Sequence, residues 1–385
     1  MENKRRIMLV ASLAGSLVNF RGDFIKDLIR TGYDVYCAAP NIFEDSKTCE
    51  FLTNNKATPV DFKLQRSGLN PFKDLQTLFS LKEAINKHKI DLVFPYTIKP
   101  VIYSSLAARQ LNVPVISLIT GLGYTFSGMS FKAKVLQKFS QFLYRSALKN
   151  NEYVVLQNID DYNLFLEKNI LSKDQKYDIV SGSGINLDKF EFRKKTNLGD
   201  KMVFVFVARL IREKGINLYI DAAKILKPKY PEAEFHIIGW SPKGSPSAID
   251  VSILKSENEK GTIVHHGQQK DVGSFLHHSD VFVLPTFYRE GIPRSSLESL
   301  SKGMPLIITD APGCRETVLN NKNGILIEPN NLDSLVNALE FFINNPDKIE
   351  PMGLNSRKYA EERFDVKIIN KQLIGLIDEV LTKNT

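Results

Sequence analysis

The sequence predicts an α/β protein made of two domains, each built on a parallel β-sheet covered by helices. Short apolar runs alternate with amphipathic helical stretches through the first half of the chain, and this alternation is typical of parallel sheets with helices on both faces. The alternation restarts at Met202, after the polar stretch Gly184–Lys201. A chain of 385 residues is also too long for one ordinary hydrophobic core, so we expect the domain boundary in that polar stretch.

The expected strands are short apolar runs, and the expected helices repeat apolar residues every three or four positions. In the first half the strands are Ile7–Ala11, Val35–Ala38, Ala57–Val60, Leu92–Pro95, Val115–Leu118, Tyr153–Leu156 and Asp178–Val180. In the second half they are Met202–Ala208, Glu234–Ile238, Thr262–His265, Val281–Leu284 and Leu306–Thr309. The helices include Phe72–His88, Pro100–Leu111, Lys214–Leu226 and Asp365–Leu381. Because ligands bind at the carboxyl ends of parallel strands, we expect functional residues in the loops that follow them.

Composition indicates a globular protein without a membrane-spanning segment. The chain is 43% hydrophobic and 24% charged, and no apolar run approaches the ~18 residues that a spanning helix needs. Lys4, Arg5 and Arg6 before the apolar stretch Ile7–Val18 resemble a signal peptide, but the same residues also suit a first buried strand and its loop, which we favour. The three cysteines are scattered, which predicts no disulfide framework and fits a reducing cytoplasm.

Basic residues are concentrated in the first half of the chain. Residues 1–190 hold 25 Lys and Arg against 18 Asp and Glu, whereas residues 191–385 hold 26 against 25, and the formal net charge is +8. A basic domain indicates an anionic partner, such as a phosphorylated substrate, a membrane surface or nucleic acid. No recognised nucleic-acid motif accompanies the charge, so we expect no nucleic-acid partner.

The segment Tyr288–Glu298 holds the strongest chemical signal. It follows the predicted strand Val281–Leu284 and opens a helix at about Pro293. The first turn of that helix offers free N–H groups and the positive end of the helix dipole to a phosphate, while Glu290 and Glu298 could accept hydrogen bonds from sugar hydroxyls. The alternative is a pair of surface glutamates around a helix start.

Several segments together resemble the GT4 family of GT-B glycosyltransferases. Glu290 and Glu298 match its E-x7-E motif, Ala208–Gly215 resembles its G-R-L-x-x-E-K-G segment, and Ser183–Phe190 resembles its N-G-V-D-x-x-x-F segment. Further landmarks are Lys302–Pro305 and Gly313–Glu316. The resemblance implies a GT-B fold, with two Rossmann-like domains facing across a cleft. It places an acceptor-side domain at residues 1–183, a nucleotide-sugar domain at 184–364, and a C-terminal helix at 365–385 that packs back on the first domain.

The resemblance also implies roles for individual residues. Arg209 and Lys214 would hold the donor diphosphate, with Glu290 on the donor sugar, and these three form the expected catalytic group. Fixed cations would stabilise the leaving diphosphate as its charge develops. The other expected donor contacts are Glu298 on the ribose, the backbone of Gly291, Ile292 and Pro293, and Arg294, Gly15 and Ser16. For Arg209 and Lys214 the alternative is a helix-end salt bridge, for example with Glu213.

The reaction implied by the resemblance retains the configuration of the anomeric carbon. The usual account is front-face attack, in which the leaving phosphate accepts the proton of the acceptor, so no protein nucleophile is needed. No D-x-D triplet is present, which disfavours a metal-dependent GT-A enzyme. Neither Gly182–Gly184 nor Gly121–Gly123 completes a G-x-G-x-x-G pattern, which disfavours a dinucleotide oxidoreductase. We therefore expect no metal and no cofactor, the nucleotide-sugar being a substrate.

The acceptor side is predicted from a narrower resemblance. Ser16–Arg21, Arg66–Phe72 and the Thr120–Tyr124 loop resemble a GT4 subgroup that builds bacterial glycans on undecaprenyl diphosphate. Many GT4 members have a histidine where this chain has Thr120, so any role of that histidine passes to Thr120, to the backbone, or to nothing. The candidate acceptor-side residues are Asn19, Arg21, Arg66, Lys99, Thr120 and Gly121, and exposed solvated charges are the alternative for the basic ones.

The partners expected from these resemblances are a nucleotide-sugar donor, a polyprenyl-diphosphate glycan acceptor and an anionic membrane surface. The donor is expected to be a UDP-N-acetylhexosamine, with GalNAc favoured. Phe131–Lys149 holds basic residues and no acid, with apolar residues at helical spacing, so it could lie on a membrane or pack on the core with a solvated basic face. We expect a cytoplasmic enzyme, peripheral at the inner face of the cell membrane. The alternatives are a soluble acceptor, another nucleotide-sugar, a non-catalytic nucleotide-sugar-binding protein and, less favoured, an epimerase.

Overall fold

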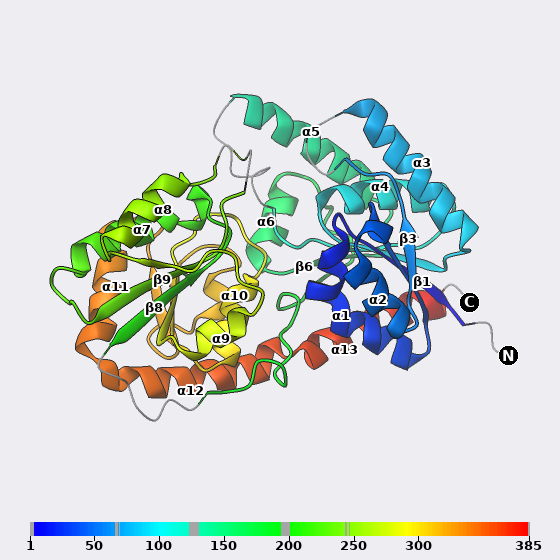
Figure 1. Cartoon of the computed structure of the whole chain (residues 1–385). Helices are drawn as coiled ribbons and strands as arrows, with labels where there is room; N and C mark the ends of the chain where they lie inside the picture. The colour runs from blue at the N-terminus through cyan, green and yellow to red at the C-terminus, as the bar shows by residue number, and fades with distance from the viewer. Residues whose placement is uncertain are drawn as a thin grey trace. The chain divides into compact units, whose positions relative to one another are not determined.

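The computed structural model describes residues 4–65, 68, 70–122, 131–193, 201–242, 245 and 247–383, and of residues 131–136 it describes the backbone alone. The chain divides into two compact units, Met1–Gly184 with Val366–Thr385, and Ile185–Asp365. Figure 1 shows the helices and strands of both units in the order of the chain.

The first unit is built on a parallel sheet. Its strands are β1 (Arg6–Val10), β2 (Asp34–Ala39), β3 (Thr58–Asp61), β4 (Leu92–Pro95), β5 (Ile116–Leu118), β6 (Tyr153–Leu156) and β7 (Tyr177–Ile179). Four of them pair in the order β3-β2-β1-β4 and three in the order β5-β6-β7. Parallel bridges from Val93 to Val115 and from Tyr96 to Leu118 join β4 to β5, so the strands described form one continuous surface.

Both faces of this sheet are buried, which explains why its strands read as continuous apolar runs. In β1, Met8 and Val10 belong to the core on one face, whereas Ile7 and Leu9 belong to the core on the other face. The helices of the unit are α1 (Ala14–Thr31), α2 (Ser46–Asn54), α3 (Pro71–Lys87), α4 (Ile98–Arg109), α5 (Phe131–Leu148), α6 (Ile159–Glu167) and the C-terminal α13 (Val366–Lys383), which packs on α1.

The second unit is a six-stranded parallel sheet in the order β10-β9-β8-β11-β12-β13. The strands are β8 (Met202–Val207), β9 (Ala233–Ile238), β10 (Val264–His265), β11 (Val281–Leu284), β12 (Leu306–Thr309) and β13 (Gly324–Ile327). The helices are α7 (Ile216–Leu226), α8 (Val251–Glu259), α9 (Val272–His277), α10 (Arg294–Ser301), α11 (Leu332–Asn344) and α12 (Ile349–Tyr359). One hydrophobic core spans the unit, with Phe204 and Phe235 stacked inside it.

The α/β prediction is confirmed, and β4, β6, β11 and β12 have the predicted bounds. Two details differ. The helix expected from Lys214 begins at Ile216, because Gly215 has a φ of +78° and separates it from a short 3-10 turn, η3 (Arg212–Lys214). The edge strand β13 was missed because it starts at a glycine in an Asn-rich loop, and only two of its four residues are fully buried.

Within the described part of the chain, no helix combines the length and the apolarity that crossing a membrane requires.

Candidate active site

The candidate donor site of the second unit lies where the strand order of the sheet changes direction. β8 is bonded to β9 on one side and to β11 on the other. In a parallel sheet, the loops that leave two such strands at their carboxyl ends go to opposite faces and open a crevice between them. The loops concerned here are residues 208–215 after β8 and 285–293 after β11.

The backbone carbonyl of Glu213 connects these two loops. It accepts hydrogen bonds from the N–H groups of Phe287 (2.9 Å) and Tyr288 (3.0 Å) and from the hydroxyl of Thr286 (2.9 Å). The carboxylate of Glu213 accepts a bond from Ser247 Oγ (2.6 Å). Glu213 therefore supports the loop architecture, and the salt bridge considered between it and Lys214 does not form.

Two glycines allow the loops of the site to approach each other closely. A Cβ at Gly215 would lie 2.0 Å from the carbonyl oxygen of Pro285, and one at Gly313, where φ is +81°, would lie 1.5 Å from the carbonyl oxygen of Gly291. Real Cβ atoms do not approach backbone oxygens so closely, and a positive φ favours glycine. The loop after β12, which carries Gly313, thus packs directly against the backbone carbonyls of Glu290 and Gly291.

Lys214 and Glu290 form an ion pair at the centre of this arrangement. Nζ of Lys214 contacts Oε1 of Glu290, and the two side chains are 11% and 13% exposed. The ammonium group also lies 5.5 Å from the centre of the Tyr288 ring. A cation and a carboxylate are thereby held next to each other, largely out of water, where electrostatic interactions are stronger than at the surface.

α10 begins immediately after this loop, with Pro293 as its N-cap residue and no side-chain cap. Arg294 Nε donates to Glu298 Oε1 at 3.2 Å, and the guanidinium lies 5.9 Å from the centre of the Phe190 ring. Burial raises the pKa of the Glu298 carboxyl above its ordinary value, an effect that Arg294 and Lys189 oppose. A partly desolvated carboxylate one turn into the helix can accept hydrogen bonds from a ligand with little competition from water.

The remaining predicted donor residues are placed less centrally. Arg209 lies two residues after the end of β8, is exposed, and forms no ion pair with any residue that the structure describes. Ile292 is partly buried against the core of the second unit. The structure thus brings Lys214, Glu290 and the start of α10 together, while Arg209 lies at the rim.

In the first unit, Gly15 and Ser16 lie in the first turn of α1. Ser16 Oγ is 2.9 Å from the hydroxyl of Tyr96, the first residue after β4, which is the strand next to β1. Arg21 was predicted as an acceptor contact, but it is 2% exposed and lies 5.5 Å over the Tyr96 ring. It therefore packs against Tyr96 in the interior of the unit and is not a surface contact. Asn19 is exposed on the same helix.

Lys99 lies in the first turn of α4, after β4. Its Nζ donates to Asp74 Oδ1 of α3 at 2.8 Å, and the side chains are 13% and 10% exposed. Burial, together with this carboxylate, raises the pKa of Tyr103. Thr97, the residue before the helix, has φ +70° and ψ 157°. This conformation is essentially restricted to glycine and costs any other residue about 1–3 kcal/mol.

The other predicted acceptor-side residues follow β5 or fall outside the structure. Thr120 and Gly121 are partly buried, and Gly121 has a φ of +108°. Arg66 lies outside the described residues, as do the side chains of Lys132 and Lys134 in the predicted basic helix.

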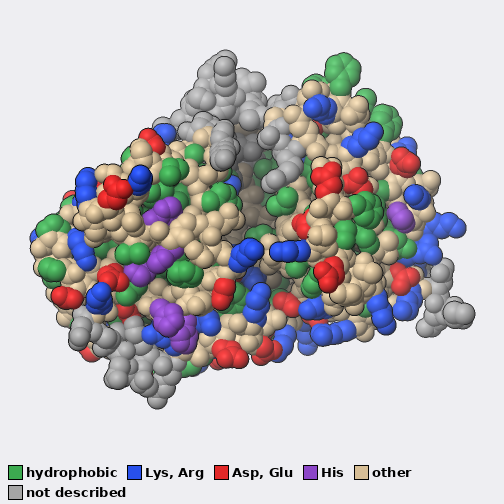
Figure 2. Space-filling model, viewed as in Figure 1, with side chains coloured by type: hydrophobic (Ala, Val, Ile, Leu, Met, Phe, Trp, Pro, Cys, Tyr) green, Lys and Arg blue, Asp and Glu red, His purple; other side chains and the backbone are tan. Residues whose placement is uncertain are grey.

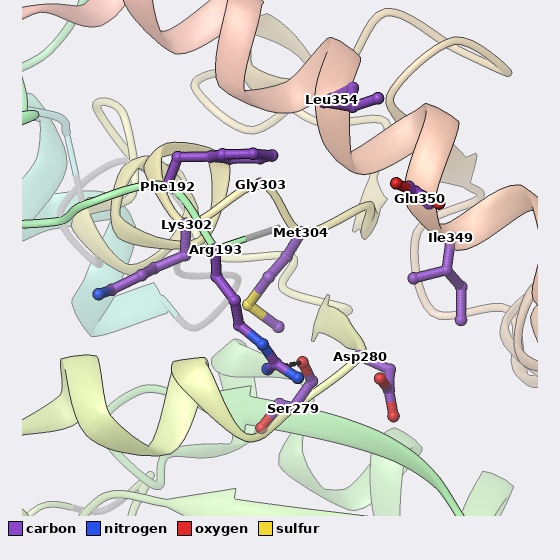
Figure 3. Close-up of a pocket in the computed structure, with 10 residues that line it drawn as sticks. All are labelled: Phe192, Arg193, Ser279, Asp280, Lys302, Gly303, Met304, Ile349, Glu350 and Leu354. Carbon is purple, nitrogen blue, oxygen red and sulfur yellow. Dashed lines mark hydrogen bonds between the residues drawn. The ribbon is translucent and has the colours of Figure 1, made fainter. Parts of the chain in front are cut away.

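Two hollows differ in size and chemistry. A cavity of about 20 Å³ (Figure 3) is lined by Phe192, Arg193, Lys302 and Met304 among others, at the amino ends of β11 and β12. It has room for about one water molecule, so it cannot accept a nucleotide-sugar. A groove of about 520 Å³ in the first unit lies at the carboxyl ends of β1 and β2, with Asn41, Glu44 and Asp45 in its wall.

Comparison with known proteins identifies the family. The model of the glycosyl transferases group 1 family matches residues 188–359, and that of the glycosyl transferase 4-like family matches residues 6–158. The chain combines a group 1 glycosyltransferase domain with a glycosyl transferase 4-like domain. It is therefore an enzyme that transfers a sugar, as the E-x7-E and E-K-G segments predicted.

Two relatives and one solved structure illustrate the similarity. The chain is 26% identical over 391 positions to the N,N'-diacetylbacillosaminyl-diphospho-undecaprenol alpha-1,3-N-acetylgalactosaminyltransferase of Campylobacter jejuni, covering 98% of this chain and 99% of that protein. It is 29% identical to the UDP-Gal:alpha-D-GlcNAc-diphosphoundecaprenol alpha-1,3-galactosyltransferase of Escherichia coli, covering 82% of each. The fold matches that of Anabaena HepE in complex with UDP, with a TM-score of 0.76, 18% identity and coverage of 98% and 100%. This fold likeness confirms the predicted GT-B fold class.

Some residues of this site were not predicted from the sequence. Gly313 was noted as a family landmark without a role, and Glu213 was considered only as a salt-bridge partner. The sequence signal for both was that Gly313 and Glu213 occupy positions that match family segments. The role of Glu213 could not be predicted, because every residue has a backbone carbonyl that can accept hydrogen bonds.

Proposed function

We propose that this glycosyltransferase moves an N-acetylhexosamine, with GalNAc favoured, from a UDP-sugar to a saccharide carried on undecaprenyl diphosphate. The product would serve surface-glycan synthesis or protein glycosylation. The Campylobacter jejuni and Escherichia coli relatives are both named for a diphosphoundecaprenol acceptor, but their names differ in the sugar transferred. This supports the acceptor class more strongly than the sugar.

The observation that carries the proposal is the Lys214–Glu290 pair beside the start of α10. With a donor bound, the ammonium group would bind the diphosphate and the carboxylate would accept hydrogen bonds from sugar hydroxyls. A fixed cation stabilises the negative charge that develops on the leaving diphosphate. Arg209 at the rim and Arg294 at the helix start would add positive charge, and Glu298 would accept from the ribose.

The transfer step requires no nucleophile from the protein. The bond between the anomeric carbon and the phosphate oxygen breaks, and the acceptor hydroxyl oxygen bonds to the same face of that carbon. The proton of the hydroxyl goes to the leaving phosphate oxygen. Glu290 and Glu298 therefore bind hydroxyl groups, unlike the acid and nucleophile of a glycosidase.

The test begins with thermal shifts in matched concentrations of UDP-GalNAc, UDP-GlcNAc, UDP-Gal and a GDP-sugar, with a chelator present. A ligand that binds the native state raises the melting temperature once its concentration exceeds its dissociation constant. We expect the largest shift with a UDP-N-acetylhexosamine, followed by transfer of that sugar to undecaprenyl-diphosphate-linked N-acetylhexosamine. A shift with the GDP-sugar alone would overturn the donor assignment.

A soluble acceptor is the second candidate. The chain is 25% identical over 299 residues to the 2-deoxystreptamine N-acetyl-D-glucosaminyltransferase of Niallia circulans, covering 73% and 72% of the two chains. Transfer to an aminocyclitol or free sugar, without transfer to the lipid-linked acceptor, would favour this candidate. Binding without transfer to any acceptor would favour a nucleotide-sugar-binding protein.

A further inference from the structure

The outer surface of α3 carries large apolar side chains that none of the described residues covers. Phe72, Leu75 and Phe79 are 82%, 49% and 58% exposed. Their spacing of three and four residues places them on one side of the helix. Single exposed apolar residues are common, whereas an aligned row of large ones marks a contact with another apolar phase or partner.

α5 adds to this surface. Phe139 and Phe142, which are 44% and 64% exposed, are also three residues apart. Both α3 and α5 pack against α4, so the two helices cover the same side of the first sheet. We call the exposed apolar side chains of the two helices, namely Phe139 and Phe142 together with Phe72, Leu75 and Phe79, the α3–α5 face.

Lysines accompany these apolar side chains. Lys73 of α3 and Lys138 and Lys149 at α5 are exposed, and residues 131–149 contain no Asp or Glu. Figure 2 shows hydrophobic and basic side chains, with an acidic one among them, at the upper right of the molecule, where Figure 1 places α3. Of the acids of α3, Asp74 is buried and paired, and Glu83 is exposed near the C-terminal end of the helix.

This combination fits an anionic lipid surface. Aromatic side chains enter the boundary between headgroups and acyl chains, and lysines around them are attracted by anionic headgroups. If the face bound a protein partner, we would expect fewer lysines in it, because lysine is depleted at protein–protein interfaces.

The inner side of α3 connects this face to the acceptor side of the enzyme. Asp74 lies between Phe72 and Leu75 in sequence, is buried, and holds Lys99 at 2.8 Å. Lys99 follows β4 at the carboxyl edge of the sheet. One turn of α3 thus presents apolar side chains outward and fixes a cation of the predicted acceptor side inward.

We propose that the α3–α5 face is a membrane-docking surface that inserts its aromatic side chains among anionic lipid headgroups. The proposal rests on the proposed function in one respect, namely that the acceptor is lipid-linked. For α5 the sequence left membrane contact and core packing as alternatives. The proposal adds α3 and assigns the apolar contact there to Phe72, Leu75 and Phe79.

The experiment measures co-flotation of the whole protein with vesicles of phosphatidylcholine, with and without phosphatidylglycerol. The variant Phe72→Ser/Phe79→Ser is compared with the matched control Val251→Ser/Ile253→Ser, whose residues are 59% and 42% exposed on α8 of the other unit. Wild type and control are expected to bind the anionic vesicles alike. The test variant is expected to partition at least about tenfold more weakly, because two large apolar side chains no longer leave water. All variants should keep the wild-type melting temperature, since the replaced side chains are exposed.

A second arm tests the charge. Lys73→Glu/Lys138→Glu should weaken binding to phosphatidylglycerol vesicles and reduce its dependence on salt. Lys255→Glu is the control, because Lys255 is exposed on α8.

Failure of this proposal and failure of the proposed function can be told apart. Wild type that binds neither kind of vesicle, or a test variant that binds as wild type does, overturns membrane docking even if transfer to a detergent-dispersed lipid acceptor is intact. Wild type that binds anionic vesicles but transfers to no lipid acceptor overturns the proposed function alone. Loss of self-association in the test variant, with unchanged vesicle binding, would assign the face to a second copy of the chain and overturn docking.

Discussion

Lys214→Met removes the ammonium group that we place on the donor diphosphate and keeps a side chain of similar length. Removing one preorganised donor to a developing negative charge costs about 10²–10³ in kcat in other enzymes, so we expect kcat/KM to fall by about that factor. The substitution also leaves Glu290, 13% exposed, without its cation. Breaking a fully buried ion pair in this way costs about 3–5 kcal/mol of stability. Because both side chains keep some contact with water, we expect Lys214→Met to lower the free energy of unfolding by about 1–3 kcal/mol.

The double variant Lys214→Met/Glu290→Gln separates catalysis from stability. Because the amide that replaces the Glu290 carboxylate carries no charge, the free energy of unfolding should return toward wild type while activity stays low. The assays are donor turnover at saturating acceptor and thermal unfolding, where about 1 kcal/mol corresponds to about 2–4 °C in a domain of this size. Lys302→Met is the matched control, because Lys302 lines the small cavity at the opposite edge of the sheet (Figure 3). Turnover by Lys214→Met within about threefold of wild type, a barrier change of about 0.65 kcal/mol, would refute the assigned role.

Three further variants test the geometry of the site. Glu298→Gln should weaken UDP binding and raise stability at neutral pH. Burial raises the pKa of the Glu298 carboxyl in the folded state, so the wild-type protein loses stability as the pH rises from the ordinary pKa of 4.5 to the raised pKa. The amide does not ionise, so the variant avoids that loss. Gly313→Ala should destabilise the second unit by about 2 kcal/mol or more and reduce donor binding, because its Cβ would lie 1.5 Å from the Gly291 carbonyl oxygen. Thr97→Gly should raise the melting temperature by relieving about 1–3 kcal/mol of backbone strain, and should change the KM for acceptor if the strained conformation shapes that site.

UDP titration measures donor binding, and acceptor kinetics measure the effect of Thr97→Gly. For Glu298→Gln, unfolding is followed from about pH 4, near the ordinary carboxyl pKa, to about pH 8. A Glu298→Gln variant whose stability keeps the pH slope of wild type would contradict the burial argument. Unchanged donor affinity in Gly313→Ala would show that the loop after β12 does not support the donor site. A lower melting temperature for Thr97→Gly would mean that contacts of the threonine side chain outweigh its strain.

The sequence determined the fold class and the chemistry of the donor loop. Buried parallel strands must be apolar on both faces, so β1, β8 and β11 could be found from their residues alone. The side chains of Lys214 and Glu290 match family segments, and residue type is what a sequence records. The family resemblance made from these segments was confirmed by the comparisons.

Which candidates meet, and which are buried, follows from long-range contacts. Residue type cannot show that Arg21 is 2% exposed and packs on the Tyr96 ring, or that Asp74 of α3 holds Lys99, because these contacts join residues far apart in the chain. Nor can it show that the Glu213 carbonyl holds residues 286–288, since every residue has a carbonyl. The sequence predicts α3 as an amphipathic helix but not that its apolar side chains are exposed. Periodicity shows that apolar residues lie on the same face of a helix, but not whether another element covers that face.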